Sequence, residues 1–463
     1  MSVARWKKAL AKLADRNRTH VNSDTSAAYR DLMAIYDNSQ IIGFPSGAEH
    51  NFWVVPPAWE VRGATLKAPD GTVLADWSRN KLSLYTYAPP FKGRVSLEDL
   101  QQHLFSIPDK PDRVPFHFRN QYRHWDPDWG FCLPHRVRER LAPGDYQVDI
   151  DTRFEPGMME MVEQVHPGEL PDTLLLVGHF DHPALCNDGL VGCLAGHEIV
   201  ARLAGRRTRL TYRMLSTVEI VGSVFYVAHE ARRKNVRQAL FMATAGADAP
   251  LQYQSTFSGD TTLDRIMRHI FRFYVSAAEK NNIHDFRMGP LGNDEIAFDA
   301  GGADIPCGVL MRGPFSEYHT DADNIAAVSE ARFEEQMRIA MRAIDMLERN
   351  TLLKRRFEGL PCLSNPKLNL YLAPSMISKV KATDGGHPAF ENCSAEARAA
   401  IAANPDALHH LHEVLPSMCE GDKTVLDVAE KAGVPFEVVD IYTDLFRDRG
   451  LMEKSWAHPF ARR

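Results

Sequence analysis

The chain has 463 residues, a formal net charge of −6 and seven cysteines. Its length exceeds what one hydrophobic core usually supports, which predicts two or three domains. The small negative charge argues against a nucleic-acid or anionic-membrane partner, and no apolar run of about 18 residues exists to span a bilayer. An odd number of cysteines without a C-x-x-C pair predicts free thiols, so we expect a cytoplasmic protein.

The first half of the chain begins with helical patterns and continues with short strands. Apolar residues at Trp6, Leu10 and Leu13 among basic residues predict an amphipathic helix, not a signal peptide, and a second helix is expected around 27–36. From about 53 to 134, short alternating strands are broken by proline and glycine. This stretch is typical of a small β-rich insert.

From about residue 145, apolar strands alternate with helices. Strands are expected at 174–177, 210–215, 239–243 and 309–311, and helices at 189–203, 262–279 and 329–348. This alternation predicts an α/β domain in which helices cover both faces of a largely parallel sheet. In such sheets, ligands bind beyond the carboxyl ends of the strands.

The C-terminal part begins with a weak pattern and ends in helices. We expect helices at 395–403 and 407–415, then a helix ending at Gly433, a short turn and a second apolar-faced helix, which together form a helix-turn-helix. The second helix would present Glu437, Asp440 and Asp444 to phosphates, which opposes DNA binding. We expect it to contact protein or to pack in an oligomer.

These patterns predict four regions. An α/β domain would comprise residues 1–50 and 135–355, with the β-rich insert at 51–134. A linker at 356–390 would lead to a winged helix-turn-helix domain at 391–463.

The strand at 174–177 leads directly into residues of the types that commonly bind metals. His179, Asp181, His182 and Asp188 follow it within a short loop. A lone loop histidine is usually hydrogen-bonded rather than ligating, but a nearby carboxylate such as Asp181 is the usual partner of a ligating histidine. Asp188 fits both a helix N-cap and a metal-bridging carboxylate. Pro183 favours a shaped loop as the explanation for His182, although a place in the site stays open.

Further candidate ligands follow later strands. Glu219 comes after the strand at 210–215, although a glutamate near a helix start is more often a surface residue. Asp294 and Glu295 lie in a loop whose glycines allow close backbone approach, and His319 lies among the carboxylates of 317–323. Nitrogen and oxygen ligands without thiolate suit zinc, with manganese or cobalt as substitutes. We therefore predict a centre for one or two ions.

The spacing of these motifs resembles the M28-type zinc aminopeptidases, and most closely their aminopeptidase-like DUF4910/DUF2172 group. The motifs are His179-Phe-Asp181, Asn187-Asp188-Gly, Glu219 before Gly222-Ser223, Asn293-Asp294-Glu295 and Tyr318-His319. The resemblance covers the whole chain, and it implies a zinc-aminopeptidase-like sheet with a β-rich insert and a C-terminal winged helix.

The same resemblance implies a ligand set with Asp188 as the bridge between two metals. One metal would be held by His179, Asp188 and Asp294, and the other by Asp188, Glu219 and His319. The family carries two adjacent glutamates, the first of which is a general base, but this chain has Val218 before Glu219. Proton transfer would then fall to Glu295 or Glu317, with Asp181 as the weaker candidate.

We predict a zinc-dependent hydrolase that cleaves a peptide or amide bond by metal-activated water, with a small peptide or amide as substrate. An amidase or deacylase of a small biosynthetic intermediate is the alternative enzyme, and a non-catalytic binding protein with the same fold is the alternative outside enzymes. A serine hydrolase is disfavoured because no G-x-S-x-G motif occurs. A homo-oligomer stays open.

Overall fold

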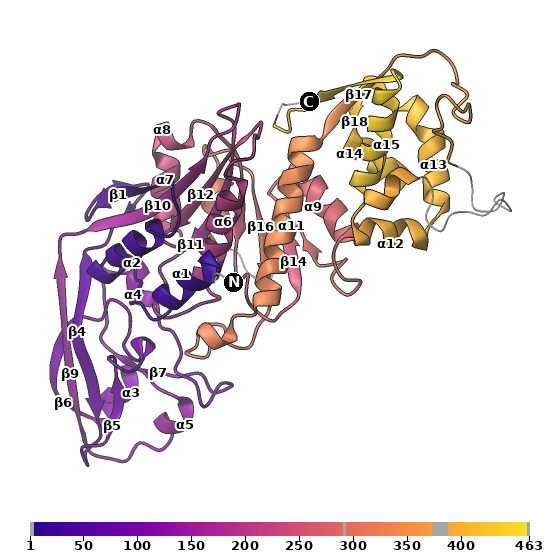
Figure 1. The fold of residues 1–463 in the computed structure, drawn as a ribbon. Coiled ribbons are helices and arrows are strands. Elements are labelled where there is room, and N and C mark those ends of the chain that lie inside the picture. Colours follow the sequence, from indigo (N-terminus) through magenta and orange to yellow (C-terminus); the bar gives the residue numbers. More distant parts are fainter. Residues whose placement is uncertain (1–3, 290–292, 373–387, 461–463) are drawn as a thin grey trace. The chain divides into compact units, whose positions relative to one another are not determined.

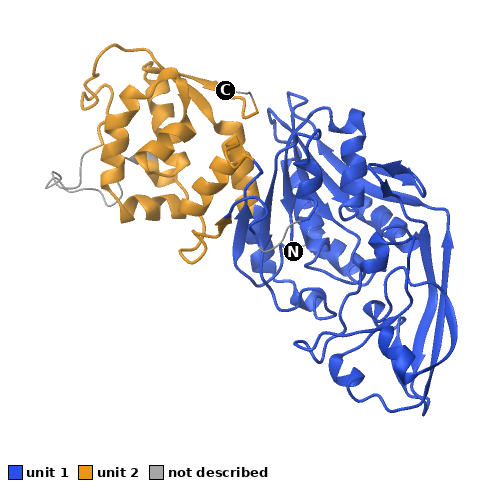
Figure 2. Ribbon diagram, turned by 180° about the vertical axis from the view of Figure 1, so that it is seen from behind, with its two compact units in different colours: residues 1–257, 284–337 blue, residues 258–283, 338–463 orange. Residues whose placement is uncertain are grey.

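The computed structural model describes residues 4–289, 293–372 and 388–460 of the chain (Figure 1). Two compact units are present (Figure 2): unit 1 comprises residues 1–257 and 284–337, and unit 2 comprises residues 258–283 and 338–463. Among the helices of the described ranges, none is both long enough and apolar enough to cross a membrane.

A mixed eight-stranded sheet forms the centre of unit 1. Its four central strands, β12, β11, β13 and β16, run parallel, whereas β1 pairs antiparallel with β10, β10 with β12, and β14 with β16. This arrangement confirms the predicted mixed α/β sheet, although only its four central strands are parallel, so the sheet is less parallel than we predicted. In spatial order the strands are β1 (Ser39–Pro45), β10 (Met158–His166), β12 (Thr211–Thr217), β11 (Thr173–His179), β13 (Val236–Met242), β16 (Cys307–Arg312), β14 (Leu251–Gln254) and β15 (Ile283–His284).

Helices cover both faces of this sheet, and the central strand β11 is therefore buried along its whole length. On one face, Leu175 and Val177 share a core cluster with Tyr226 of α7 (Val221–Ala228) and Phe298 of α10 (Glu295–Phe298). On the other face, α6 (Leu190–Leu203) packs against β11 and β12. Helix α1 (Arg5–Leu13) packs on α6, and α2 (Ser23–Met33) packs on α1 and β10 (Figure 1).

Helix α6 approaches the sheet closely because it carries glycine at the contact. A Cβ atom at Gly192 would lie only 2.1 Å from the carbonyl oxygen of Met242, at the end of β13. The close packing fixes the start of α6, and Asp188 precedes that start by two residues. The N-terminus of the helix therefore positions one of the candidate ligands.

The insert of unit 1 is built on a second, four-stranded sheet with its own core. Trp59, Leu66, Tyr87 and Val148 lie in that core. The sheet order is β5 (Val73–Asp76), β4 (Ala58–Lys67), β9 (Asp145–Glu155) and β6 (Phe91–Ser96). Strand β9 belongs to this sheet, although it lies beyond residue 134, where we placed the end of the insert. It pairs with β4 from Gln147 to Glu155 and with β6 from Asp145 to Ile150.

Short elements complete unit 1. They are β2 (Glu49–His50), β3 (Trp53–Val54), η1 (Lys81–Ser83), α3 (Leu97–Gln102), β7 (Leu104–Phe105), α4 (Arg119–Tyr122), β8 (Phe131–Cys132), α5 (His135–Arg138), α8 (Glu230–Arg233) and η2 (Ile325–Ala327).

Unit 2 combines helices with a small antiparallel sheet. The sheet order is β18 (Glu420–Thr424), β17 (Thr351–Arg355) and β19 (Met452–Trp456). The helical elements are α9 (Thr262–Phe273), α11 (Glu330–Arg349, which begins in unit 1), η3 (Pro388–Asn392), α12 (Ala395–Ala403), α13 (Asp406–Val414), η4 (Leu415–Ser417), α14 (Val425–Ala432) and α15 (Phe436–Asp448).

Helix α9 belongs to unit 2, although we expected residues 262–279 as part of the α/β domain. Arg265 donates a hydrogen bond to Asp427 of α14 at 2.7 Å, and the ring of His269 accepts one from the backbone amide of Phe436 at 2.9 Å. Strand β17, also assigned to the α/β domain, pairs with β18 and β19. The winged helix stays a prediction, and residues 373–387 of the predicted linker lie outside the described residues.

Candidate metal centre

Two neighbouring parallel strands deliver the first candidate ligands to the same edge of the sheet. Strand β11 ends at His179, which pairs in register with Thr217 at the end of β12, and Glu219 follows two residues later. Asp188 lies at the end of the loop after β11, and His319 lies in the loop after β16. These positions lie beyond the carboxyl ends of parallel strands, as the sequence pattern predicts.

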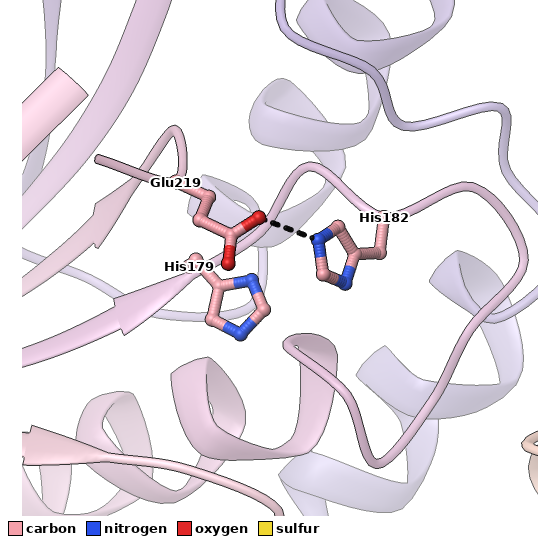
Figure 3. A group of neighbouring side chains, drawn as sticks. All are labelled: His179, His182 and Glu219. Atoms are coloured by element: carbon pink, nitrogen blue, oxygen red, sulfur yellow. Dashed lines mark hydrogen bonds and ion pairs between the residues drawn. The ribbon is translucent and has the colours of Figure 1, made fainter. Parts of the chain in front are cut away.

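The side chains of these residues form two overlapping groups. His179, His182 and Glu219 form one group (Figure 3), and His182, Asp188 and His319 form the other, with ligand atoms of each group within 4.8 Å of one another. The carboxylate of Asp188 lies 3.4 Å from Nε2 of His179, 3.2 Å from Nδ1 of His182 and 2.8 Å from Nε2 of His319. Asp188 therefore contacts all three histidines of the centre.

His182 links the two groups, and its sequence context gave little sign of this. Its Nε2 atom lies 3.0 Å from Oε2 of Glu219, while Nδ1 faces Asp188. We favoured a shaped loop for this residue because Pro183 follows it. The loop is indeed shaped, since Ala184 has a positive φ of 54°, and the ring of His182 lies in the centre.

Burial makes the electrostatics of the centre strong. His179 and His182 are each 2% exposed, and Asp188 is 5% exposed. Burial raises the pKa of Asp188, but the charge of His182 and hydrogen bonds from the three histidines hold that pKa well below its usual value. Burial lowers the pKa of His182, but the charges of Asp188 and Glu219 raise it well above normal. A cation at this position would replace the protons that now balance the carboxylates.

Asp294 lies fully buried beside the centre, although it is in neither group. Its Oδ1 atom accepts hydrogen bonds from the amide of Ile220 at 2.9 Å and the hydroxyl of Ser223 at 2.6 Å. Its Oδ2 atom and Nδ1 of His179 are buried without a hydrogen-bond partner among the described residues. Burial raises the pKa of Asp294 to about 7. Such unpaired oxygen and nitrogen atoms fit a bound cation, because each can offer it a lone pair that no protein group occupies.

Residues behind the ligands hold them in place. Asp181 accepts a hydrogen bond from the amide of Glu219 at 2.8 Å, and its other oxygen lies 3.1 Å from Nε2 of His20. Asp323 accepts hydrogen bonds from the amides of Asn187 and Asp188, each at 2.8 Å. These contacts fix the two loops that carry the candidate ligands.

The insert contributes one wall of the centre, which no local sequence signal indicated. The hydroxyl of Tyr122 donates a hydrogen bond to Glu219. The ring of Phe116 lies 5.0 Å from that of His182 and 5.4 Å from that of His319, and its amide donates to the carbonyl of His319 at 2.9 Å. The side chains of the insert therefore cover the ligand histidines with aromatic rings.

Three residues at or next to the candidate ligands have positive φ angles. Ile220, next to Glu219, has a φ of 57°, and His319 itself has a φ of 54°. Gly189, next to Asp188, has a φ of 110°, and a Cβ there would lie 2.8 Å from the carbonyl of His179. Such conformations cost free energy and persist where the surrounding structure enforces them, which is common at functional sites.

The three candidates for the proton-transfer role lie in different surroundings. Asp181 is buried and holds Glu219 and His20, as described above. Glu295 is also buried, and it accepts hydrogen bonds from Arg287 at 3.1 Å and Gln254 at 3.3 Å. Glu317 is partly exposed and accepts a hydrogen bond from Ser316 at 2.8 Å. Residues 290–292 of the glycine-rich loop before Asp294 lie outside the described residues.

The sheet, the helices on both of its faces and the cluster of candidate ligands at its edge define an α/β protein with a candidate metal centre. The family model described as a domain of unknown function, DUF4910, matches residues 11–350. The chain belongs to this family.

Known relatives are consistent with this assignment. A Clostridium acetobutylicum protein, named for polysaccharide biosynthesis and for an aminopeptidase-like domain, is 28% identical over 403 residues, which cover 86% of this chain and 85% of that protein. The crystal structure of a protein described as a peptidase, also from Clostridium acetobutylicum, has a TM-score of 0.79 at 24% identity, and the match covers 97% of this chain and 96% of that one.

More distant structures share the fold. BSAP, a zinc aminopeptidase from Bacillus subtilis, has a TM-score of 0.52 at 13% identity, covering 73% of this chain and 93% of its own. An M28 peptidase precursor from Shewanella amazonensis has a TM-score of 0.51 at 10% identity, covering 77% and 97%. The fold is therefore that of the M28-type zinc aminopeptidases, as the motifs predicted.

Proposed function

We propose that this protein is a zinc-dependent hydrolase that cleaves a peptide or amide bond. The observation that carries the proposal is the convergence of three histidines and two carboxylates beyond the carboxyl ends of the parallel strands in the mixed sheet. Such a set of nitrogen and oxygen donors, without a thiolate, suits zinc, and manganese or cobalt would be substitutes.

His179, Asp188, Glu219, Asp294 and His319 would hold one or two ions, and His182 adds a sixth donor to the set predicted from sequence. Zinc bound there would supply Lewis acidity, which polarises a carbonyl and lowers the pKa of a coordinated water. The protein itself supplies orientation: Asp181 and Tyr122 fix Glu219, and Asp323 fixes the backbone of Asp188.

For proton transfer, we favour Glu317 over Glu295 and Asp181. The carboxylates of Glu295 and Asp181 are fully buried, and both oxygens of each already contact other groups. Glu317 is partly exposed and lies two residues before His319. A general base needs hydrogen-bond reach to the coordinated water, and a partly exposed carboxylate in the same loop as His319 can turn toward it.

A deacylase or amidase of a small biosynthetic intermediate is the second candidate. The Clostridium acetobutylicum relative is named for polysaccharide biosynthesis as well as for its aminopeptidase-like domain, which favours a substrate other than a free peptide. Val218 favours it too, because it stands where the M28 peptidases carry their first glutamate.

The test is metal analysis followed by assay of the full chain. Protein loaded with zinc and freed of excess metal should retain zinc and hydrolyse an aminoacyl p-nitroanilide or an N-acyl amide. Asp188→Asn should lose both properties, whereas Asp149→Asn, an exposed carboxylate that pairs with Lys92, should lose neither. Protein that retains no zinc and hydrolyses neither substrate would instead indicate the non-catalytic binding protein.

A further inference from the structure

An unusual turn lies on the insert side of unit 1. Strands β2 and β3 form a hairpin whose register pairs His50 with Trp53, so the turn consists of Asn51 and Phe52 alone. Both have positive φ angles, 48° and 65°. This geometry is that of a type I′ turn, in which asparagine suits the first position and glycine is usual at the second.

Phe52 is therefore held in a conformation that its side chain disfavours. It is also 99% exposed, so its ring gains nothing from burial. A large aromatic side chain that is both strained and exposed suggests that this ring is presented to a ligand.

A pocket of about 310 Å³ lies beside this turn, at the lower end of the ~300–1,000 Å³ typical of small-molecule sites. Phe52, Trp53, Tyr122 and Trp125 provide aromatic surface in its lining, and Asn51 and Gln121 provide amides. Trp125 is 64% exposed. Tyr122 connects the pocket to the metal centre, because its hydroxyl hydrogen-bonds Glu219.

Gln121 gives the strongest indication of a ligand. Its side chain is 1% exposed, and neither its amide nitrogen nor its amide oxygen has a hydrogen-bond partner within the described ranges. A buried primary amide without partners is costly, and turning this side chain toward the pocket, to a ligand that offers both a donor and an acceptor, would remove that cost.

The pocket lining carries no formal charge. Among the described residues that line it there is no carboxylate, lysine or arginine, and the one histidine among them, His124, has a pKa lowered by burial and by the charge of His20. A neutral group with an apolar face for aromatic stacking and hydroxyls for the amides fits these features. A hydroxylated sugar ring has this combination, whereas an apolar peptide side chain would leave Gln121 unpaired.

We propose that this pocket binds the sugar ring of an N-acylated amino sugar, whose amide then lies toward the metal centre. This inference rests on the proposed hydrolase function and names its substrate class. Hydrolysis would add one water across the C–N bond, releasing the carboxylate and the amino sugar, with a proton passing to the leaving nitrogen.

Binding is tested on the full chain after chelator treatment, so that turnover does not interfere. Saturation-transfer NMR with N-acetylglucosamine should show contact with the ring protons. Gln121→Ala and Trp125→Ala should each weaken binding at least tenfold, while Gln147→Ala, an exposed amide on β9, should leave it unchanged. Because Trp125 is largely exposed, its loss should not disturb folding.

Phe52→Gly separates ligand binding from folding. Glycine suits the turn, so the midpoint of thermal unfolding should stay the same or rise, while sugar binding falls. A lower midpoint together with unchanged sugar binding would overturn the role of this ring.

N-acetyl-L-phenylalaninamide serves as the peptide-like probe. If it binds with the same sensitivity to Gln121→Ala and the sugar does not, the pocket is a side-chain subsite and the sugar proposal is wrong. Binding of neither probe also overturns it. Sugar binding by a protein that hydrolyses nothing after zinc loading would contradict the hydrolase function alone, because the binding assay requires neither metal nor turnover.

Discussion

The Nε2 atom of His182 lies 3.0 Å from Oε2 of Glu219, and this contact joins the loop after β11 to the loop after β12. The other ring nitrogen of His182 lies 3.2 Å from Oδ2 of Asp188. His182 is therefore the one residue shared by both groups of candidate ligands in the described part of the chain. Its side chain therefore has the position of a candidate metal ligand, although its backbone lies in a loop.

Replacing His182 should weaken zinc binding. We expect His182→Ala to lower zinc affinity by at least ~10- to 100-fold, the loss seen for residues that support metal ligands. Competition with a chromogenic chelator measures this directly. His135→Ala, on α5 and hydrogen-bonded to Ser106, is the matched control and should leave affinity unchanged. Equal zinc affinity in both variants would show that His182 is not a donor.

Tyr122→Phe should reduce zinc affinity and amide hydrolysis by about 10-fold, because it removes the hydrogen bond that orients Glu219. Tyr146→Phe removes a comparable hydrogen bond to the carbonyl of Ala142, within the insert, and should change neither property. Chelator competition and steady-state kinetics provide the two measurements. Unchanged values for Tyr122→Phe would mean that Glu219 needs no support from the insert.

Each unit contains a buried histidine that stays neutral in the folded state, so each unit should lose stability in acid. Burial lowers the pKa of His197 in unit 1 to about 3, and burial with the charges of Arg272 and Arg265 lowers that of His269 in unit 2 to about 3. In the unfolded chain these histidines titrate near ~6.5. The unfolded state therefore binds more protons below that pH, so this stability is complete above pH ~6.5 and is lost as the pH falls toward ~3.

At pH ~5, each histidine should lower the free energy of unfolding of its unit by about 2 kcal/mol relative to pH 7, at roughly 1.4 kcal/mol per pH unit below ~6.5. Urea unfolding at pH 7 and pH 5, followed separately for the two units, measures this loss. His269→Gln should reduce the acid loss of unit 2 and leave that of unit 1 unchanged. If the variant unfolds with the same pH dependence as the parent, His269 does not stay neutral in the folded state.

Gly192→Ala should destabilise unit 1, because its Cβ would lie 2.1 Å from the carbonyl oxygen of Met242. Overpacking of this kind typically costs about 1–3 kcal/mol. Gly301→Ala is the control, since a Cβ there meets no atom within 4 Å and its φ is not positive. Chemical denaturation of both variants tests the close packing of α6. A Gly192→Ala protein as stable as the control would mean that α6 moves away without cost.

The fold of unit 1 could be predicted because its strands are strongly patterned. The buried run from Leu174 to Val177 and the periodic apolar residues after Gly189 predicted β11 and α6 with small errors at their ends. The positions of His179, Asp188 and Glu219 followed, because parallel strands bring their carboxyl ends to one edge.

Contacts between distant segments could not be predicted in the same way. Tyr122 and His20 approach the centre from the insert and the N-terminal region, and no local periodicity indicates which loop they reach. His182 was underestimated for a related reason, since its partners Asp188 and Glu219 lie on other parts of the chain and Pro183 indicated only the shape of the loop. The partners of α9 and β17 depend on segments far along the chain.

The place of α9 affects how this protein can be synthesised and divided. Its apolar residues are buried, and it is made before the residues of α14 and α15 that its Arg265 and His269 contact. During translation, these two contacts of α9 cannot form until residues 425–448 have emerged. A protein truncated at residue 350, where the family match ends, would lack the partners of Arg265 and His269. Exchange of the C-terminal region between relatives would therefore have to include residues 258–283.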